Sequence, residues 1–588
     1  MAERLLKEHL YGDLLAPTPG YSTDFALGMT YSLSFEALLN AHLAFGMLGD
    51  MNDNVIQSPH LLLEAITKSS DKVVVFCNKG GIHVPPTIRK VYSLMERNVF
   101  EVFDKNDINA NFHPKLWLIR ERNIDDKSDV SLKLIVTSRN LAYSDTIDCV
   151  ACLTGHVGSS NVKNEKHAPL IAFIKEVVKA SNIGEEQRKS VLKLAKDLER
   201  VEQFDVDAPF EDYDFFPFLF RQDFGLGNVN DYLVGTESII VSPFIHKRMI
   251  DILNPNDKCH RTLVTRKEYV DVEMFNRFQN KGGIYIALDE LASRGMDLHA
   301  KMYYVWYGRN RQYLFLGSAN ATTTAFERNG EFLLRLKYKS SNSHTTIFLK
   351  EFYENGNGDS KFMPLNDPVE SASFEIKRDM AEHSMKALMC TEDLTARITH
   401  HRDGLFSTTV SSNLKHLAND VFIAPLQRKT LRQRWTGKAV FDGMMADELS
   451  EFYILSATSP EGCPHQSIIK IETTGMPSDR DQSIYRGIIK TKKDFFRFLE
   501  LMLTDTPLQY MSSEMLLLGS LGDVTEKSDA PLFPNLYEKM LKTAAANPTQ
   551  IYEIRQWIGK LGEDVVPTSF KKVYKHFVSA LEKSSYEK

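Results

Sequence analysis

The sequence predicts an α/β fold with two similar halves, followed by a mainly β region and a helical end. Over residues 1–155, short β-rich runs alternate with helical stretches, the pattern of a layered α/β domain. A second run of the same kind repeats the first further along the chain. After a linker at 354–371, which contains glycine, asparagine and proline, the pattern changes.

The first half is expected to contain six strands and two helices. The strands are expected at 25–33, 73–76, 99–103, 112–120, 132–140 and 145–155. The helices are expected at 34–45 and 86–98. A periodic segment at 169–201 then indicates one long helix or two short ones.

The second half has a matching order of expected strands, at 237–245, 260–267, 283–290, 298–307, 312–320 and 331–338. An acidic and aromatic segment at 205–220 precedes it. We expect the phenylalanines of this segment to pack between the halves. The alternative is a substrate mimic that lies over a cationic site and controls access to it.

We therefore divide the chain into five regions: a first half (1–160), a helical insertion with the acidic aromatic linker (161–230), a second half (231–355), a mainly β accessory domain (371–475) and a helical C-terminal region (480–588). In the accessory domain, short β-like runs are expected at 406–412, 420–426, 451–459 and 467–475. In the last region, helical spacing is expected at 492–505, 537–546, 552–562 and 570–583.

Composition narrows the class of protein. With 588 residues, of which 43% are hydrophobic and 25% charged, the chain is globular and too long for one small module. The net charge of −6 excludes a basic scaffold, so any contact with nucleic acid must use a local patch. No apolar run approaches the roughly 20 residues that span a bilayer, and the opening residues are charged where a signal peptide would be apolar. We expect a cytoplasmic protein without membrane contact.

Six cysteines are too few for a disulfide framework, so we expect free thiols. Cys149 and Cys152 lie on an expected strand, where residues three apart point to opposite faces, and we interpret them as a buried structural pair rather than metal ligands. Cys259 with His260, and Cys463 with His465, lack a second pair at zinc spacing. We expect neither a metal nor another cofactor.

One set of polar residues occurs twice in the same order. A His-x-Lys pair comes first, then a strand ending in Ser-x-Asn, then an acid at the start of the next strand. Residues two apart on a strand share a face, so each His/Lys pair projects into the same space. The set consists of His113, Lys115, Ser138, Asn140 and Asp148 in the first half, and His299, Lys301, Ser318, Asn320 and Glu331 in the second.

These residue types suit cleavage of a phosphodiester. Lysines and asparagines can clamp the anionic phosphate, one neutral imidazole can attack phosphorus, and a second, protonated imidazole can donate to the leaving oxygen. The carboxylates would fix the histidine tautomers through the far ring nitrogens. A purely structural alternative is that the Ser-x-Asn pairs form turns at strand ends. Asp148 is the weakest match in the repeat, because it follows Asn140 by eight residues whereas Glu331 follows Asn320 by eleven.

The stretches HPK…TSRN and HAK…GSAN…NGEF resemble the two half-motifs of the phospholipase D superfamily. Over residues 20–350 this resemblance implies a pseudo-twofold, phospholipase D-like domain of two β-α-β sandwich halves, with one active site between them. It also implies that His113 is the nucleophile and His299 the general acid. Phospholipases have an aspartate shortly after the lysine, whereas Arg120 and Trp306 stand five residues beyond Lys115 and Lys301. The pattern is closer to tyrosyl-DNA phosphodiesterases and bacterial nuclease-like members.

A second candidate site is a basic stretch in the accessory domain. Residues 426–438 contain no acid and suit a nucleic-acid backbone with a stacked base, although an ordinary solvated face has the same composition. Its candidate residues are Arg428, Lys429, Arg432, Arg434, Trp435 and Lys438.

We therefore expect a metal-independent phosphodiesterase, a nuclease for which DNA is favoured over RNA as the substrate without RNA being excluded, and which in a bacterium would suit antiviral defence against foreign DNA. The C-terminal domains would select substrate or a partner protein. The alternatives are a lipid phosphodiesterase or phosphatidyl transferase, and an inactive nucleic-acid-binding or interaction module. The sequence does not distinguish endonuclease from exonuclease action, or one oligomeric state from another.

Overall fold

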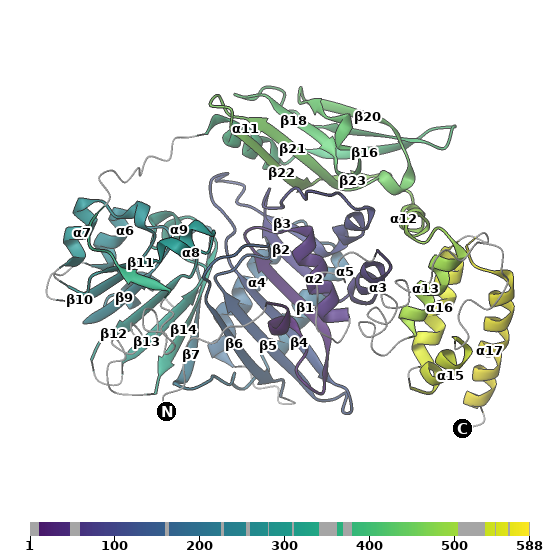
Figure 1. The fold of residues 1–588 in the computed structure, drawn as a ribbon, viewed down its shortest axis with the longest axis horizontal. Coiled ribbons are helices and arrows are strands. Elements are labelled where there is room, and N and C mark those ends of the chain that lie inside the picture. The colour runs from purple at the N-terminus through teal and green to yellow at the C-terminus, as the bar shows by residue number, and fades with distance from the viewer. Residues whose placement is uncertain are drawn as a thin grey trace.

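The computed structural model describes residues 11–46, 59–158, 164–224, 228–254, 259–279, 281–308, 311–339, 361–368, 379–503, 536–546, 548–561 and 565–586. The architecture is mixed α/β, with four sheets and a C-terminal helical region (Figure 1). Most of the expected linker at 354–371 lies outside the described residues.

The first half forms a six-stranded sheet in the order β3-β2-β1-β4-β5-β6. Its strands are β1 (Tyr21–Thr30), β2 (Val73–Asn78), β3 (Val99–Val102), β4 (Leu116–Asn123), β5 (Val130–Thr137) and β6 (Val150–His156). The first three are parallel to one another, and β4, β5 and β6 continue the sheet in antiparallel order.

The helices of this half are α1 (Tyr11–Leu15), α2 (Phe35–Gly46) and α3 (Pro59–Ser69). The α3 helix was not expected from the sequence. The segment expected to be a helix at 86–98 is instead a 3-10 helix, η2 (Lys90–Asn98), most of whose residues are buried. It packs between the first half and the accessory domain, where the Gln427 amide donates to the Arg89 carbonyl.

The second half forms a nine-stranded sheet in the order β15-β11-β10-β9-β12-β13-β14-β7-β8. Its strands are β7 (Phe210–Leu219), β8 (Gln222–Asp223), β9 (Glu237–Val241), β10 (His260–Val264), β11 (Ile284–Ala287), β12 (Met302–Trp306), β13 (Gln312–Gly317), β14 (Glu331–Tyr338) and β15 (Phe362–Pro364). The run β11-β10-β9-β12-β13-β14 has the order and strand directions of the first sheet.

The described residues of this half contain the helices α6 (Lys247–Leu253), α7 (Val272–Gln279), α8 (Asp289–Ser293) and α9 (Thr323–Glu327). Short 3-10 turns occur at η4 (Val229–Tyr232) and η5 (Lys267–Tyr269). The β15 strand pairs with β11 and lies within the expected linker, so this sheet extends past the expected boundary at residue 355.

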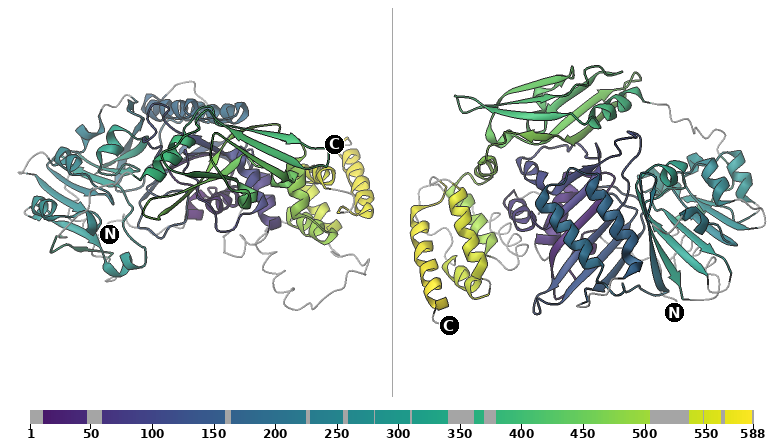
Figure 2. Two further views of the ribbon diagram at one scale, coloured as in Figure 1. Left: turned by 90° about the horizontal axis from the view of Figure 1, so that it is seen from above. Right: turned by 180° about the vertical axis from the view of Figure 1, so that it is seen from behind.

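The two sheets lie side by side, and they share one hydrophobic core (Figures 1 and 2). The segment at 169–201 is two helices, α4 (Ala168–Lys179) and α5 (Glu185–Leu198), preceded by η3 (Glu165–His167). Their apolar faces join this shared core. The core is continuous from Leu134 of the first sheet to Phe332 of the second, which fixes the halves relative to each other.

The acidic aromatic segment is mostly strand β7, which pairs with β14. Its Tyr213 and Phe215 are buried in the core shared by the two halves. Three of its five acidic side chains, those on β7, pair with cations: Asp212 with Lys166, Asp214 with Arg335 and Glu211 with Lys337. The part of the segment that forms β7 is therefore built into the second sheet, and the alternative of a substrate mimic that lies over a cationic site is wrong for this strand.

The accessory region, where the structure describes it (379–475), contains two four-stranded sheets, ordered β20-β17-β16-β23 and β19-β18-β21-β22, together with helix α11 (Met380–Met389). The strands are β16 (Thr395–His400), β17 (Phe406–Ser411), β18 (Val421–Pro425), β19 (Gln433–Arg434), β20 (Lys438–Met444), β21 (Phe452–Thr458), β22 (Pro464–Lys470) and β23 (Glu472–Thr474). Short turns η6 (Leu426–Leu431) and η7 (Ala446–Glu448) connect them.

The C-terminal region is helical and lies against the first half, on the side away from the second half (Figure 1). Its helices are α12 (Arg480–Ile488), α13 (Lys492–Met502), α15 (Leu536–Ala546), α16 (Pro548–Lys560) and α17 (Thr568–Tyr586). None of the described helices is both long and apolar enough to cross a membrane.

Candidate active site

The two His/Lys pairs lie where the halves meet. Each pair is in an extended segment directly before a strand, β4 or β12, rather than within the strand as the sequence suggested. The reason is that the histidine segment pairs with the opposite half. The His113 amide donates to the Gly330 carbonyl at 2.8 Å, and the His299 amide donates to the Ile147 carbonyl at 2.9 Å.

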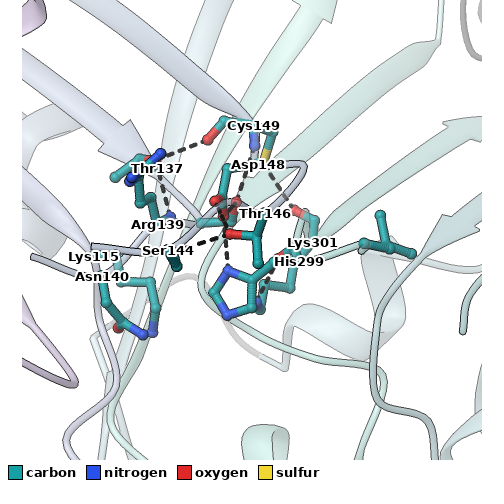
Figure 3. A network of polar contacts seen from close by, with 12 residues as sticks. Lys115, Thr137, Arg139, Asn140, Ser144, Thr146, Asp148, Cys149, His299 and Lys301 are labelled. Carbon is teal, nitrogen blue, oxygen red and sulfur yellow. Dashed lines mark hydrogen bonds and ion pairs between the residues drawn. The ribbon is translucent and has the colours of Figure 1, made fainter. Parts of the chain in front are cut away.

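This crossing brings each histidine to the carboxylate of the other half. His113 Nδ1 lies 2.8 Å from Glu331 Oε2. His299 Nδ1 lies 2.7 Å from Asp148 Oδ1, the pair that Figure 3 shows. An ionised carboxylate accepts hydrogen bonds only, so it holds the proton on Nδ1 and leaves Nε2 for chemistry. The sequence placed one acid in each half, and the structure shows that the pairs form between halves.

The two serines support the carboxylates. The Ser138 hydroxyl donates to Asp148 Oδ1 at 2.6 Å, and the Ser318 hydroxyl donates to Glu331 Oε2 at 2.5 Å. Each hydroxyl also accepts from the backbone amide that follows the acid, at Cys149 and Phe332. Both carboxylates are therefore fixed by hydrogen bonds from their own half as well as from the opposite histidine.

The two lysines are almost completely buried, with Lys115 1% and Lys301 0% exposed. Lys115 Nζ donates to the His113 carbonyl at 2.9 Å, and Lys301 Nζ donates to the His299 carbonyl at 2.5 Å. Among the described residues, neither ammonium group forms an ion pair, and a buried ammonium group without an ion pair remains short of negative charge. The site is therefore ready to receive an anion.

The two asparagines follow β5 and β13 in equivalent places. Leu141, next to Asn140, donates its amide to the Thr30 hydroxyl, and Ala321, next to Asn320, donates to the Ser242 hydroxyl, both at 2.9 Å. Asn140 Oδ1 accepts from the Ser32 amide at 3.4 Å. Asn320 Oδ1 is buried and has no hydrogen-bond partner among the described residues.

Burial controls the protonation of the site. It lowers the pKa of His113 to about 4, against the opposing effect of Glu331, and it lowers the pKa of His299 to about 4, against that of Asp148. Burial also lowers the pKa of Lys301 to about 8, and burial together with the charge of Lys301 lowers the pKa of Lys115 well below its usual value. Without a ligand, both imidazoles are neutral at pH 7.

Asp148 keeps its charge in these surroundings. Burial acts to raise its pKa, but hydrogen bonds from His299, Ser138 and Thr146 outweigh burial and lower the pKa to about 2. The carboxylate is therefore ionised at neutral pH and can hold the Nδ1 proton of His299.

Sequence reasoning missed three residues in this site. The centroid of the Tyr31 ring lies 5.0 Å from that of the His113 ring and 5.7 Å from Lys115 Nζ. Thr146 and Asn329 each donate to a carboxylate. Both stand two residues before their acid, and this polar-x-acid spacing is visible in the sequence. Tyr31 gives no comparable signal, because it only follows β1.

The basic stretch of the accessory domain is separate from this site. It lies around η6, β19 and the start of β20, whereas the opposite edge of the same sheet, β22, contacts the first half through Ile468 and Ile82. Arg428 pairs with Glu448 at 3.0 Å and Arg434 with Asp420 at 2.5 Å. Arg432 lies over the Phe422 ring at 3.9 Å. Lys429 and Lys438 are exposed.

Trp435 was expected to stack on a base, and this expectation is wrong. Its side chain is 4% exposed and belongs to the core of the accessory domain, and its indole donates to the Leu414 carbonyl at 2.7 Å. The apolar ring contributes more by packing in this core than it would at the surface.

The expected burial of Cys149 and Cys152 as a structural pair is wrong. Cys152 is exposed on β6 and Cys149 is half-buried just before it, so they do not form a buried structural pair. Among the described residues there is no group of three or more His, Cys, Asp or Glu side chains that could hold a metal ion.

Comparison with known protein families finds no match, and comparison with curated proteins finds none. Among solved structures, two mutants of the yeast tyrosyl-DNA phosphodiesterase are similar to this chain, at 13% and 12% identity and a TM-score of 0.34 in both cases. Each match covers 56% of this chain, and 84% or 85% of the yeast chain. We therefore base the functional conclusion on the geometry of the site.

Proposed function

We propose that this chain is a metal-independent phosphodiesterase of the phospholipase D type, a nuclease that cleaves DNA through a phosphohistidine intermediate. The observation that supports it most directly is the crossed pairing of His113 with Glu331 and of His299 with Asp148, beside two buried lysines. The equal strand order of the two sheets supports a pseudo-twofold domain with this single site between its halves.

The chemistry proceeds in two displacements. His113 Nε2 attacks phosphorus, the bond from phosphorus to the leaving oxygen breaks, and His299 Nε2–H gives its proton to that oxygen. A water then loses a proton to His299 Nε2 and attacks phosphorus, and the bond between phosphorus and His113 breaks. Lys115, Lys301 and the two asparagines neutralise the non-bridging oxygens.

Protonation of His299 for the first step follows from substrate binding. A bound diester puts a negative charge next to imidazoles whose pKa is about 4 in the free protein, and an opposite charge favours the protonated form. Glu331 and Asp148 hold the Nδ1 proton throughout, so protons move only at Nε2.

The substrate class is tested with a panel of single- and double-stranded DNA, RNA and phospholipid vesicles, each with and without EDTA. We expect DNA cleavage that survives EDTA, because the lysines supply the charge that a metal ion would otherwise provide. Activity lost in EDTA and restored by Mg²⁺ or Mn²⁺ would contradict the mechanism. Cleavage of vesicles instead of DNA would favour the lipid phosphodiesterase.

The shared site is tested with His113→Ala and His299→Ala. We expect each variant to lose turnover by several orders of magnitude while it remains folded, and the double variant to be no worse, since the histidines act as a unit. Circular dichroism and single-turnover rates on DNA measure this. A single variant that keeps a rate near that of the wild type would exclude one shared site.

A further inference from the structure

Each carboxylate has a third hydrogen bond that the mechanism above does not use. The Thr146 hydroxyl donates to Asp148 Oδ2 at 2.7 Å, and the Asn329 amide donates to Glu331 Oε1 at 3.2 Å. In both halves the donor stands two residues before the acid, and the histidine and serine both contact the other oxygen. Two unlike side chains thus make the same contact in equivalent places.

This contact fixes the rotation of the carboxylate. When only one oxygen is held, a carboxylate can turn about its terminal bond and change the direction of the hydrogen bond that orients the imidazole. A donor on the second oxygen prevents that turn. Attack at phosphorus needs the ring nitrogen in line with the leaving oxygen. A carboxylate that has turned would hold the imidazole at the wrong angle and so slow the reaction.

We propose that Thr146 and Asn329 are positioning residues that orient His299 and His113 through Asp148 and Glu331, an inference that rests on the proposed function. The two residues differ in how firmly their surroundings hold them. Asn329 is only 7% exposed, and its Oδ1 also accepts from the Asn111 amide at 3.1 Å, two residues before His113. It therefore joins the carboxylate of one half to the histidine segment of the other.

Thr146 has a looser setting. It is half-buried, and its hydroxyl lies 3.2 Å from the hydroxyl of the exposed Ser144. A neighbouring hydroxyl or a water can replace part of its contact. Loss of the side-chain donor should therefore reduce turnover more at Asn329 than at Thr146.

Asn329 is tested with Asn329→Ala and Asn329→Asp, assayed on bis(p-nitrophenyl) phosphate, whose small size leaves out polymer contacts. For Asn329→Ala we expect kcat to fall about 10- to 100-fold with KM changed less than threefold, as for other groups that orient a reactive imidazole. Unchanged kcat in a folded variant would overturn the proposal, and so would an effect confined to KM.

Asn329→Asp gives a signature that a structural role would not. The new carboxyl lies against Glu331, and two carboxylates in contact cannot both ionise, so one proton is shared at low pH. A protonated Asp donates to Glu331 as the amide did. The kcat of this variant relative to wild type should therefore rise as pH falls, and a constant ratio across pH would overturn the proposal. The other titratable groups around Glu331 are His113, Lys115, Lys301 and Tyr303.

Thr146 is tested with Thr146→Val, which keeps the shape and removes the donor, and Thr146→Ser, which keeps the donor. We expect Thr146→Val to lower kcat about 3- to 10-fold and Thr146→Ser to restore it, with Ser144→Ala close to wild type as the matched control. If Thr146→Ser is as slow as Thr146→Val, packing rather than the hydrogen bond is responsible.

A measurement independent of activity separates this inference from the proposed function. In protein labelled with 15N-histidine, the ring shifts report which nitrogen bears the proton, and His113→Ala and His299→Ala assign the signals. We expect both wild-type rings to be protonated at Nδ1, with Asn329→Ala mixing the tautomers of His113 alone. An unchanged His113 signal would overturn the inference even if the wild type cleaves DNA. An inactive wild type with the expected shifts would contradict the proposed function only.

Discussion

At the scale of single residues, burial determines how the site is charged before substrate arrives. Lys115 and Lys301 have almost no exposed surface, and the pKa of each is lowered by burial. The charge of Lys301 lowers the pKa of Lys115 as well. Desolvation of an ammonium group is costly, and a phosphate that enters between two such groups offsets the cost for both. The same burial that weakens the lysines as cations in the empty site therefore favours a bound anion.

This arrangement predicts an alkaline limb in the pH profile. The pKa of Lys301 is lowered to about 8, so its positive charge is present below that pH and is lost as the pH rises through about 8. We expect kcat/KM on bis(p-nitrophenyl) phosphate, which reports the free enzyme, to fall above pH 8. In Lys301→Arg the charge persists at all accessible pH values, so the limb should move to higher pH even if the rate is lower. A limb that stays at the same pH would assign it to another group.

Half-motifs of the site could be predicted because their residue types are unusual on strand ends and occur twice. The pairing between halves could not, since it depends on His113 and Gly330 becoming neighbours only in the folded chain. Thr146 and Asn329 share a spacing to their acids, but threonine and asparagine are common before strands. Trp435 was expected at the surface because its neighbours in the sequence are basic. Its burial depends on residues that contact it only in the folded chain.

At the scale of elements, the hairpin of β12 and β13 holds the second half of the site. Gly317 ends β13, and its amide donates to the Lys301 carbonyl at 3.2 Å. A Cβ atom there would lie 2.2 Å from the Phe332 carbonyl oxygen, so only glycine lets β13 approach β14 this closely. Ser318 follows Gly317 directly, and Glu331 directly precedes Phe332, so the same close approach brings the Ser318 hydroxyl to the Glu331 carboxylate.

We therefore expect Gly317→Ala to push β13 away from β14 and to separate Ser318 from Glu331. The free energy of unfolding should fall by about 2 kcal/mol or more, and kcat should fall further than KM rises. Gly308→Ala is the matched control: Gly308 lies in the turn of the same hairpin, also has a positive φ of 95°, and has nothing within 4 Å of an added Cβ. Thermal unfolding and kinetics of both variants measure the difference. Equal losses in the two would mean that backbone strain alone is responsible.

The strands were easier to predict than the helices that cover them. The run at 132–140 contains the β-branched residues Ile135, Val136 and Thr137, and the run at 331–338 contains Phe332 and Tyr338; they correspond to β5 and β14. The α3 helix was missed because three consecutive leucines hide its 3.6-residue period, and β15 was missed because it is three residues long and lies among glycine and proline. Long-range pairing, and not local preference, makes β15 a strand.

At the scale of the whole molecule, the accessory domain is fastened to the first half near the site. Ser467 and Ile468 of β22 donate to the Gly80 and Ile82 carbonyls, and the Lys470 amide donates to Glu101. Glu101 also accepts from Lys79 Nζ and the Gly80 amide. The loop at 79–82 follows Asn78, whose Oδ1 accepts from the Phe112 amide next to His113. A run of contacts thus connects the accessory domain with the histidine segment.

The basic stretch at 426–438 begins in η6, where Gln427 contacts the first half, and continues along β19, at the edge of its sheet opposite β22. A DNA contact there would therefore be additional to the one at the catalytic residues. Among the described residues, no acid lies within ion-pair distance of Lys429 or Lys438, unlike Arg428 and Arg434. If these lysines bind phosphates, Lys429→Gln with Lys438→Gln should weaken DNA binding across sequences and lower the slope of log affinity against log salt by up to about 1.8 for duplex DNA.

The matched control is Lys492→Gln with Lys493→Gln, which makes the same change in net charge at two exposed lysines of α13. We expect this control to leave the salt slope nearly unchanged, because a charge that contacts no phosphate releases no counterion. Turnover of bis(p-nitrophenyl) phosphate should be unchanged in both variants, since a small diester contacts the catalytic residues and not these lysines. Fluorescence anisotropy from low to high salt measures the slopes. If both pairs change the slope equally, the effect is one of net charge alone, the stretch at 426–438 is an ordinary solvated face, and DNA is held by the two halves without the accessory domain.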